Sequence, residues 1–215
     1  MISRLFIFFI LLSSNGLFAQ KNIPFVGTLT YEIKNLILKD EKPTQMLVLS
    51  CDSIVRIETQ SKIFGRQSYI KHLIKNKSYL LISLSESQNY AIRGDFSKTD
   101  SSKQSMQYIW KKKFGFKKIG GLSSKKIKLT HLKSEKSFNF YYSVKFSAKY
   151  NEVYTDLPGL PTLYYVETED GVLEYRLLKY TTLTPNYDLF GIPSDYQKVT
   201  FDEFVDLLNN GGTNN

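Results

Sequence analysis

The chain has 215 residues and a formal net charge of +9, with fifteen Tyr, fifteen Phe, one Trp and one Cys. This length is enough for one domain with a substantial core. A single cysteine excludes an intramolecular disulfide, so stability must come from packing, and Cys51 within an apolar run is expected to be a buried free thiol.

Charge is divided unevenly along the chain. Residues 21–150 carry 25 Lys and Arg against nine Asp and Glu, whereas residues 151–215 carry three against eleven. A basic body favours anionic partners such as lipid head groups, lipopolysaccharide or nucleic acid. Nucleic acid is not expected, because the basic residues are 24 Lys against five Arg and phosphate recognition favours Arg. Low Ala with abundant Lys, Asn, Ile, Tyr and Phe is also typical of an AT-rich genome, which would explain the basic charge without any partner.

The N-terminal residues have the pattern of a cleavable secretory signal. Arg4 precedes the apolar run from Leu5 to Leu12, which is short for a membrane span, and Ala19-Gln20 follows a group of small residues. We expect residues 1–19 to be removed, residues 20–210 to form one domain and residues 211–215 to be a flexible tail. The protein would then be exported to the periplasm or the outer membrane, and a retained membrane anchor is the alternative.

Alternating apolar and polar residues predict an antiparallel meander in the first half of the chain. In residues 25–33, for example, Leu29 and Tyr31 alternate with Thr28 and Thr30. Turn residues separate this segment from further short runs of the same kind. The expected strands cover residues 25–33, 44–51, 53–60, 67–74, 78–84 and 89–93, and later 125–132 and 137–146.

Between these two groups of strands the hydrophobic period changes. Met106, Ile109, Trp110 and Phe114 fall at helical spacing with lysines opposite, which predicts an amphipathic helix over residues 101–113. Its apolar face either packs on the core or covers a ligand cavity. Ten lysines within residues 111–136 form the most basic tract, which is either a solvated surface or a landing patch for anionic lipid or a protein partner.

A β-hairpin is predicted over residues 162–180. Asp170-Gly171 separates two runs rich in β-branched and aromatic residues, which favours a type I′ turn. Counting outward from this turn places Val166 opposite Tyr175 and Glu167 opposite Glu174. We interpret the two glutamates as a solvent-screened pair and not as a glycosidase dyad. The opposite, apolar face carries Tyr164, Val166, Leu173, Tyr175 and Leu177.

The C-terminal region predicts one short helix. Thr200 and Glu203 fit a capping box, and apolar residues at helical spacing follow up to the stop at Gly211-Gly212. We expect this helix to be amphipathic and to dock on the sheet.

Catalytic and metal-binding motifs are not apparent. His72 and His131 each stand alone on a predicted strand, and the chain contains no Cys-x-x-Cys, no Gly-rich phosphate loop and no Gly-x-Ser-x-Gly elbow. We therefore expect a protein without enzyme activity, metal or cofactor. A hydrolase would require one histidine within hydrogen-bonding reach of a nucleophile.

Several motifs in order resemble a known family. They are residues 118–126 (KIGGLSSKK), residues 157–161 (LPGLP) and residues 190–196 (FGIPSDY). Together they resemble the exported Bacteroidetes proteins of the GLPGLI type, a family of unknown function, although Ser124 stands where many relatives carry Cys and Pro161 where an apolar residue is common. These relatives are similar to the LolA/LppX-like periplasmic proteins. The resemblance implies a mainly antiparallel β (α+β) fold, in which a curved half-barrel sheet wraps around one or two helices and can hold lipid chains.

Two functional hypotheses follow. The first is a non-enzymatic, exported half-barrel that binds an acyl chain of a lipid or lipoprotein, or another apolar ligand, in its concave face. The second is a cell-envelope protein-interaction module without a small-molecule ligand, whose partners, including an anionic membrane surface, are selected by charge. The ligand-binding residues of the first hypothesis are Met106, Trp110, Phe114, Tyr164, Val166, Tyr175 and Leu177.

Overall fold

The computed structural model describes residues 24–38, 41–61, 65–75, 77–85, 87–95, 108–168 and 171–211. The expected signal sequence, Met106, Asp170 and residues 212–215 of the expected tail lie outside these ranges. Residues 101–107 of the predicted helix also lie outside them.

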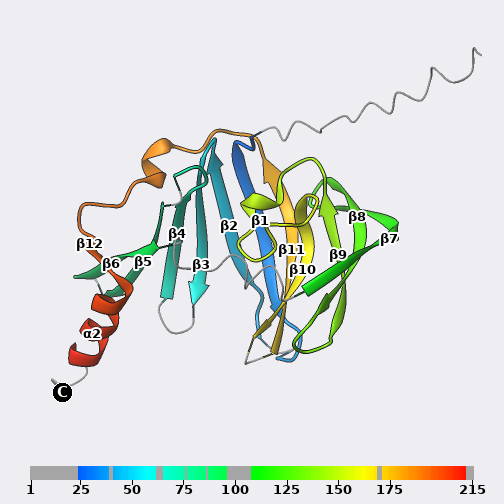
Figure 1. Cartoon of the computed structure of the whole chain (residues 1–215). Coiled ribbons are helices and arrows are strands. Elements are labelled where there is room, and N and C mark those ends of the chain that lie inside the picture. The colour runs from blue at the N-terminus through cyan, green and yellow to red at the C-terminus, as the bar shows by residue number, and fades with distance from the viewer. Residues whose placement is uncertain are drawn as a thin grey trace, which may run out of the picture.

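Within the described residues, twelve strands form a single curved sheet (Figure 1). Its order is β12-β6-β5-β4-β3-β2-β1-β11-β10-β9-β8-β7, and every neighbouring pair is antiparallel except β12 with β6. This confirms the expected mainly antiparallel β fold. The strands are β1 (Gly27–Asn35), β2 (Thr44–Cys51), β3 (Ile54–Ser61), β4 (Gly65–His72), β5 (Lys77–Ser85), β6 (Gln88–Asp95), β7 (Tyr108–Ile119), β8 (Leu122–His131), β9 (Ser137–Ser143), β10 (Leu160–Thr168), β11 (Gly171–Thr181) and β12 (Gln197–Val199).

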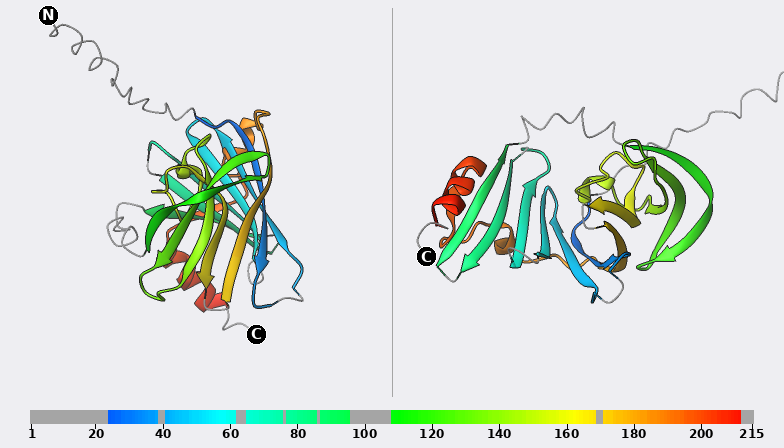
Figure 2. Two further views of the ribbon diagram at one scale, coloured as in Figure 1. Left: turned by 90° about the vertical axis from the view of Figure 1, so that its right-hand side faces the viewer. Right: turned by 90° about the horizontal axis from the view of Figure 1, so that it is seen from below.

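The first strand joins two meanders. β1 pairs with β2 on one side and with β11 on the other, so β1–β6 and β7–β11 meet at the centre of the sheet. Seen from below, the β7–β11 half curls strongly, whereas the β2–β6 half is flatter (Figure 2). The sheet is therefore strongly curved on one side of β1 and more open on the other.

The predicted helix over residues 101–113 is wrong for all of its described part. Residues 108–113 belong to β7, which pairs with β8 from Tyr108↔His131 to Ile119↔Leu122. The register of this pair shifts between Lys112 and Phe116, at a bulge that interrupts strand alternation. The bulge explains why the period of two was not visible in the sequence.

An irregular segment, residues 144–159, occupies the inside of the curled half. It contains the 3₁₀ turn Ala148–Tyr150 and lies over the concave face in front of β1 and β10 (Figure 1). Its side chains Tyr150 and Tyr154 are almost fully buried, and the Tyr150 ring meets Phe25 at a centroid distance of 5.7 Å. This covering segment fills the position where a helix was expected.

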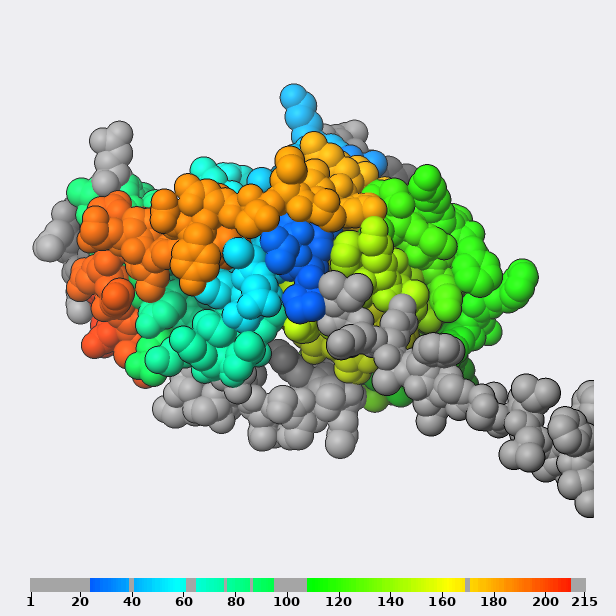
Figure 3. Space-filling view, turned by 90° about the horizontal axis from the view of Figure 1, so that it is seen from above, coloured from blue at the N-terminus to red at the C-terminus, as the bar shows by residue number. Residues whose placement is uncertain are grey.

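The convex face of the flat half is covered by residues 182–196, which run along the molecule from β11 to β12 (Figure 3). Arg56 of β3 donates to the Leu189 carbonyl over 2.7 Å, and Asn89 of β6 donates to the Asp195 carboxylate over 2.9 Å. Ile192 and Tyr196 pack against a small buried cluster that includes Ile70 and Leu81. Residues 182–196 thus provide apolar cover on the side of the flat half opposite to the concave face.

The single α-helix of the described residues is α2 (Phe201–Gly211), at the β6 end of the sheet (Figure 2). Its capping box is confirmed, because Thr200 N donates to the Glu203 carboxylate over 2.7 Å and Glu203 N donates to Thr200 Oγ1 over 3.2 Å. Phe204 packs against Tyr90 of β6. Across the described ranges, no helix has the length and apolar character needed to cross a membrane.

The β10–β11 hairpin forms with the predicted faces but a different register. Thr168 pairs with Gly171, so Val166 lies opposite Leu173 and Tyr164 opposite Tyr175. The predicted pairs are each displaced by two residues, which leaves the alternation of faces unchanged. The predicted Glu167–Glu174 pair is therefore wrong, because Glu167 faces Val172 and Glu174 faces Tyr165.

Candidate functional site

An apolar cavity of about 290 Å³ lies between the concave face of the sheet and the covering segment. Strands β1 to β5 supply one wall, and residues 150–153 supply the other. Thr59, Gln67, Asn151 and Glu152 add polar groups to the wall. The aromatic and aliphatic lining consists of Tyr31, Met46, Val48, Ile57, Tyr69, Leu80, Tyr150, Val153, Tyr164 and Tyr175.

Three tyrosines from neighbouring strands form the aromatic end of this cavity. The Tyr164 and Tyr175 rings stack at 4.7 Å with an interplanar angle of 10°, and the Tyr31 ring meets Tyr164 edge-on at 6.0 Å. The Tyr31 hydroxyl donates to the Pro161 carbonyl over 2.8 Å. Burial raises the pKa of all three phenols, so they are neutral at physiological pH and present ring surface and not charge.

The covering segment is held in place by polar contacts at several points. Glu152 forms an ion pair with Lys71 of β4, with the carboxylate oxygen 2.6 Å from Nζ. Asn151 Oδ1 accepts hydrogen bonds from the backbone N–H groups of Val153 and Tyr154 over 2.9 and 2.8 Å. The Tyr154 hydroxyl donates to the Tyr165 carbonyl over 2.6 Å. These contacts give the cavity a defined wall despite the absence of regular structure there.

The structure places the predicted ligand-binding residues in different environments. Tyr164 and Tyr175 line the cavity. Leu177 is on the same face but only 1% exposed, because the β7–β8 turn covers it at Gly120. Trp110 is half-buried on β7 away from the cavity lining, and Phe114 is 96% exposed, so neither can contact a ligand held there. Met106 lies outside the described residues.

Most of the cavity wall was not identified from the sequence. Met46, Val48, Ile57 and Tyr69 lie on β2, β3 and β4, which the pattern of short runs bounded by turn residues predicted as strands, without assigning all of these side chains to an inner face. That pattern was the available signal. It could not indicate that these faces line a cavity, because this depends on the curvature of the sheet and the path of the covering segment.

A second, more polar cavity of about 710 Å³ lies beside the first and shares Glu152 and Val153 with it. Val166, the remaining predicted ligand-binding residue, lines this cavity together with Tyr108, His131 and Glu167. The Tyr108 hydroxyl donates to the Asp156 carboxylate on the covering segment.

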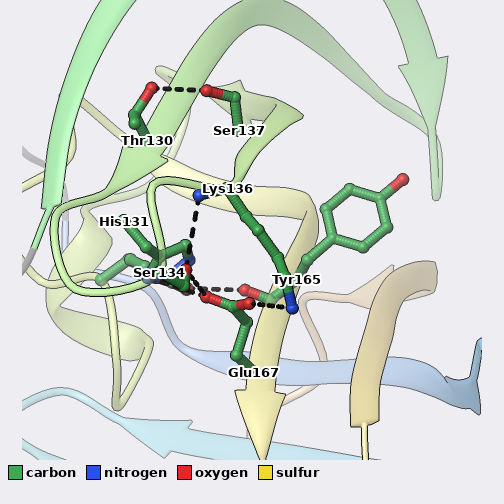
Figure 4. A network of polar contacts seen from close by, with 8 residues as sticks. Thr130, His131, Ser134, Lys136, Ser137, Tyr165 and Glu167 are labelled. Atoms are coloured by element: carbon green, nitrogen blue, oxygen red, sulfur yellow. Dashed lines mark hydrogen bonds and ion pairs between the residues drawn. The ribbon is translucent and has the colours of Figure 1, made fainter.

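Glu167 is the centre of a polar network at this second cavity (Figure 4). One of its carboxylate oxygens accepts from Ser134 Oγ over 2.5 Å, and the other is 3.0 Å from Lys136 Nζ. Burial on its own would raise the pKa of Glu167, but the hydrogen bonds from Ser134 and Lys136 outweigh it and lower the pKa. The carboxylate is therefore a stable anion that holds the β8–β9 turn.

Neither histidine is placed beside an activated nucleophile within the described ranges. Burial lowers the pKa of His131, and the neighbouring Glu167 opposes this only in part. His131 Nε2 is 3.4 Å from the Tyr154 hydroxyl, whose proton is directed to the Tyr165 carbonyl. His72 Nδ1 accepts from the backbone N–H groups of Ile74 and Lys75, both over 3.3 Å, and so closes the β4–β5 turn. No group of three metal-ligating side chains occurs in the part of the chain that the structure describes.

Comparisons with known proteins give structural neighbours only. No family model matches the chain, and no curated protein matches it. Among solved structures, the chain is similar to PNGF-II in its C2 crystal form, with a TM-score of 0.54 and 13% identity over 85% of this chain and 32% of PNGF-II. The P21 form of PNGF-II gives a TM-score of 0.53 at 12% identity, over 84% and 33% of the two chains.

MucB in complex with MucA(peri) is a further neighbour, with a TM-score of 0.44 and 14% identity over 81% of this chain and 56% of MucB. The chain thus spans about a third of the length of PNGF-II and just over half that of MucB. At these identities the similarity to PNGF-II concerns the fold alone: a curved, open, mostly antiparallel sheet is an architecture that this chain shares with a solved protein.

Proposed function

We propose that this protein is an exported, non-enzymatic carrier with a LolA-like half-barrel, which binds a lipid acyl chain or a similar apolar ligand in its concave face. The observation that carries the proposal is the apolar cavity between the sheet and residues 150–153. A filled core would leave no such space, whereas here ten aromatic and aliphatic side chains face it. Its location in the periplasm or at the outer membrane belongs to the same proposal.

The size and polarity of the cavity restrict the ligand class. Its volume of about 290 Å³ is at the lower end of small-molecule sites, which typically measure about 300–1,000 Å³. We therefore expect one acyl chain or one small apolar molecule, and not a lipid with all its chains enclosed. Glu152 and Gln67 at the wall would orient a polar end of the ligand.

Native mass spectrometry tests this proposal directly. The protein is purified without detergent from a periplasmic extract, and bound mass is then identified by solvent extraction. We expect discrete additional mass that extracts as lipid. Leu80→Trp, which places an indole in the cavity, should lower ligand occupancy, whereas Leu178→Trp on β11, outside the cavity lining, should leave it unchanged. A bare polypeptide mass, or equal occupancy in both variants, would contradict the proposal.

The alternative is an interaction module of the cell envelope, and the separation of charge in space favours it. The basic β7–β8 hairpin and α2, with Asp202, Glu203 and Asp206, lie at opposite ends of the sheet (Figure 2). Such a charge distribution orients an approaching charged partner. This alternative expects a steep loss of partner capture with rising salt and no bound lipid.

A further inference from the structure

The β7–β8 hairpin carries uncompensated positive charge. Residues 108–131 contain eight lysines and no Asp or Glu, and seven of the eight lysines are exposed. Lys111 lies directly opposite Lys128 in the pairing of the two strands. Like charges at opposed positions destabilise a sheet. In the part of the chain that the structure describes, none of these lysines forms an ion pair with a carboxylate.

Two phenylalanines project from the same hairpin. Phe114 is 96% exposed and Phe116 is 63% exposed, with their ring centroids 6.4 Å apart in an edge-to-face arrangement. They flank Gly115, at the bulge of β7, where φ is +138°. A bulge of this kind re-aims side chains away from the sheet. Lysines 113 and 117 adjoin the pair in sequence, so the rings lie within the basic surface.

We propose that this hairpin docks the protein on an anionic lipid bilayer, with Phe114 and Phe116 inserted at head-group depth and the lysines against lipid phosphates. Aromatic rings favour the membrane–water interface, and lysines near an anionic surface add electrostatic attraction. The lipid phosphates neutralise the lysines that have no carboxylate partner, and insertion into the bilayer buries the exposed rings. Neither cavity described above is lined by residues 109–128, and docking on a bilayer does not require a pocket.

The β7–β8 hairpin supplies no residue to the concave apolar cavity, so docking through it is independent of the ligand held there. A carrier that fails to hold lipid could still dock, and a protein that fails to dock could still hold lipid. The two readouts, bound mass and vesicle binding, therefore distinguish failure of either proposal.

Vesicle co-sedimentation of the purified protein provides the test. Vesicles of phosphatidylglycerol mixed with phosphatidylcholine are compared with vesicles of phosphatidylcholine alone. We expect binding to the anionic vesicles only, with the partition coefficient falling about fivefold for each lysine removed, so that Lys111→Gln with Lys128→Gln loses more than tenfold. Phe114→Ser with Phe116→Ser should lower it by about tenfold or more.

Matched controls use equivalent changes elsewhere on the surface. Ile74→Ser with Leu183→Ser removes two side chains that are 77% and 79% exposed, and Lys42→Gln with Lys75→Gln removes two exposed lysines, all outside the hairpin. Both control variants should bind anionic vesicles as the unmodified protein does. All variants have the same residues 1–23, so any contribution of these residues to vesicle binding is equal and cancels when the variants are compared.

Trp110 provides an independent readout. It is the only tryptophan of the chain and lies on β7, four residues before Phe114. Brominated phosphatidylglycerol in the vesicles should quench its fluorescence, and this quenching should be lost in the double phenylalanine variant.

Three results would overturn the proposal. The first is equal binding to both vesicle types, and the second is unchanged binding of the double phenylalanine variant. The third is capture by poly-glutamate, lost in the double lysine variant, without any binding to anionic vesicles, which would assign the surface to an acidic protein.

Discussion

The carboxylate of Glu152 lies 2.6 Å from Nζ of Lys71, and this ion pair joins the covering segment to β4 across the edge of the apolar cavity. The Lys71 side chain is only 13% exposed, whereas that of Glu152 is 36% exposed. The pair therefore combines a nearly buried cation with a carboxylate that can leave toward solvent. We therefore expect the covering segment to detach from β4 first at Glu152.

Glu152→Gln tests the contribution of this ion pair. Because the change leaves the largely buried Lys71 without its anion, we expect a loss of about 1–2 kcal/mol in the free energy of unfolding, measured with urea. Hydrogen exchange in residues 150–156 should accelerate as the segment opens more often. The control is Glu32→Gln, which removes a more exposed pair with Lys34 within β1 and should cost less than about 0.5 kcal/mol. Equal effects of the two changes would contradict the assigned role.

The stacked tyrosines of the hairpin give a second prediction. Tyr175→Ala removes the ring that stacks on Tyr164 at 4.7 Å and should cost about 2–3 kcal/mol of unfolding free energy, since the ring is partly buried. It should also lower the ligand occupancy seen by native mass spectrometry. Tyr175→Phe keeps the ring and should preserve both quantities. Tyr187→Ala, at a ring that is 64% exposed, is the control for loss of an aromatic side chain. Loss of occupancy in Tyr175→Phe would show that the hydroxyl, and not the ring, contacts the ligand.

Stability should fall at alkaline pH because buried phenols stay protonated. Burial raises the pKa of Tyr69 and Tyr165 to about 12 and raises that of Tyr31 as well, whereas unfolded tyrosine titrates near 10. The unfolded chain therefore releases protons that the folded protein keeps, so the stability is complete below about pH 10 and is lost progressively from there toward about pH 12. Urea unfolding at about pH 8 and about pH 11 measures this loss.

Comparison of Tyr31→Phe with the unmodified protein isolates one of these phenols, because any contribution of the lysines to the pH dependence is the same in both proteins. The variant should lose about 1 kcal/mol at neutral pH, because the Pro161 carbonyl loses its donor. Its stability should nevertheless decline less steeply above about pH 10, by up to about 1.4 kcal/mol per pH unit, since one fewer proton is linked to unfolding. Parallel pH profiles of the two proteins would contradict this linkage.

The sequence was informative about local structure and less so about assembly. Strand alternation correctly placed Tyr164 and Tyr175 on one face, because the period of two survives a displacement of the hairpin register by two residues. The turn signal Asp170-Gly171 located the turn only to within one residue, since Gly171 already pairs with Thr168 as part of β11. This small displacement was enough to make the Glu167–Glu174 pairing wrong.

The failure at β7 has a physical cause. Phe114 follows Trp110 by four residues, as in a helix, but it lies in the irregular stretch between Lys112 and Phe116, where the register shifts and the period of two is interrupted. The cavity could not be predicted from the sequence, for a different reason. Its wall combines residues from β1, β2, β3 and β4 with the covering segment, whose irregular path depends on specific contacts such as Lys71–Glu152. Such contacts carry no periodic signal.

Closure of the curled half depends on the approach of the β7–β8 turn to β11, and two glycines allow a matched test. Gly120 and Gly65 have φ of +55° and +62°, so alanine at either position incurs similar backbone strain of about 1–2 kcal/mol. A Cβ on Gly120 would lie 2.5 Å from Leu177 Cγ, whereas a Cβ on Gly65 meets no described atom within 4 Å. We therefore expect Gly120→Ala to cost about 1–3 kcal/mol more than Gly65→Ala in urea unfolding. Leu177→Ala should recover part of this difference when combined with Gly120→Ala, because it removes the clashing side chain. Equal costs for the two glycine variants would show that the turn can move away from β11, and that the curled half does not depend on this contact.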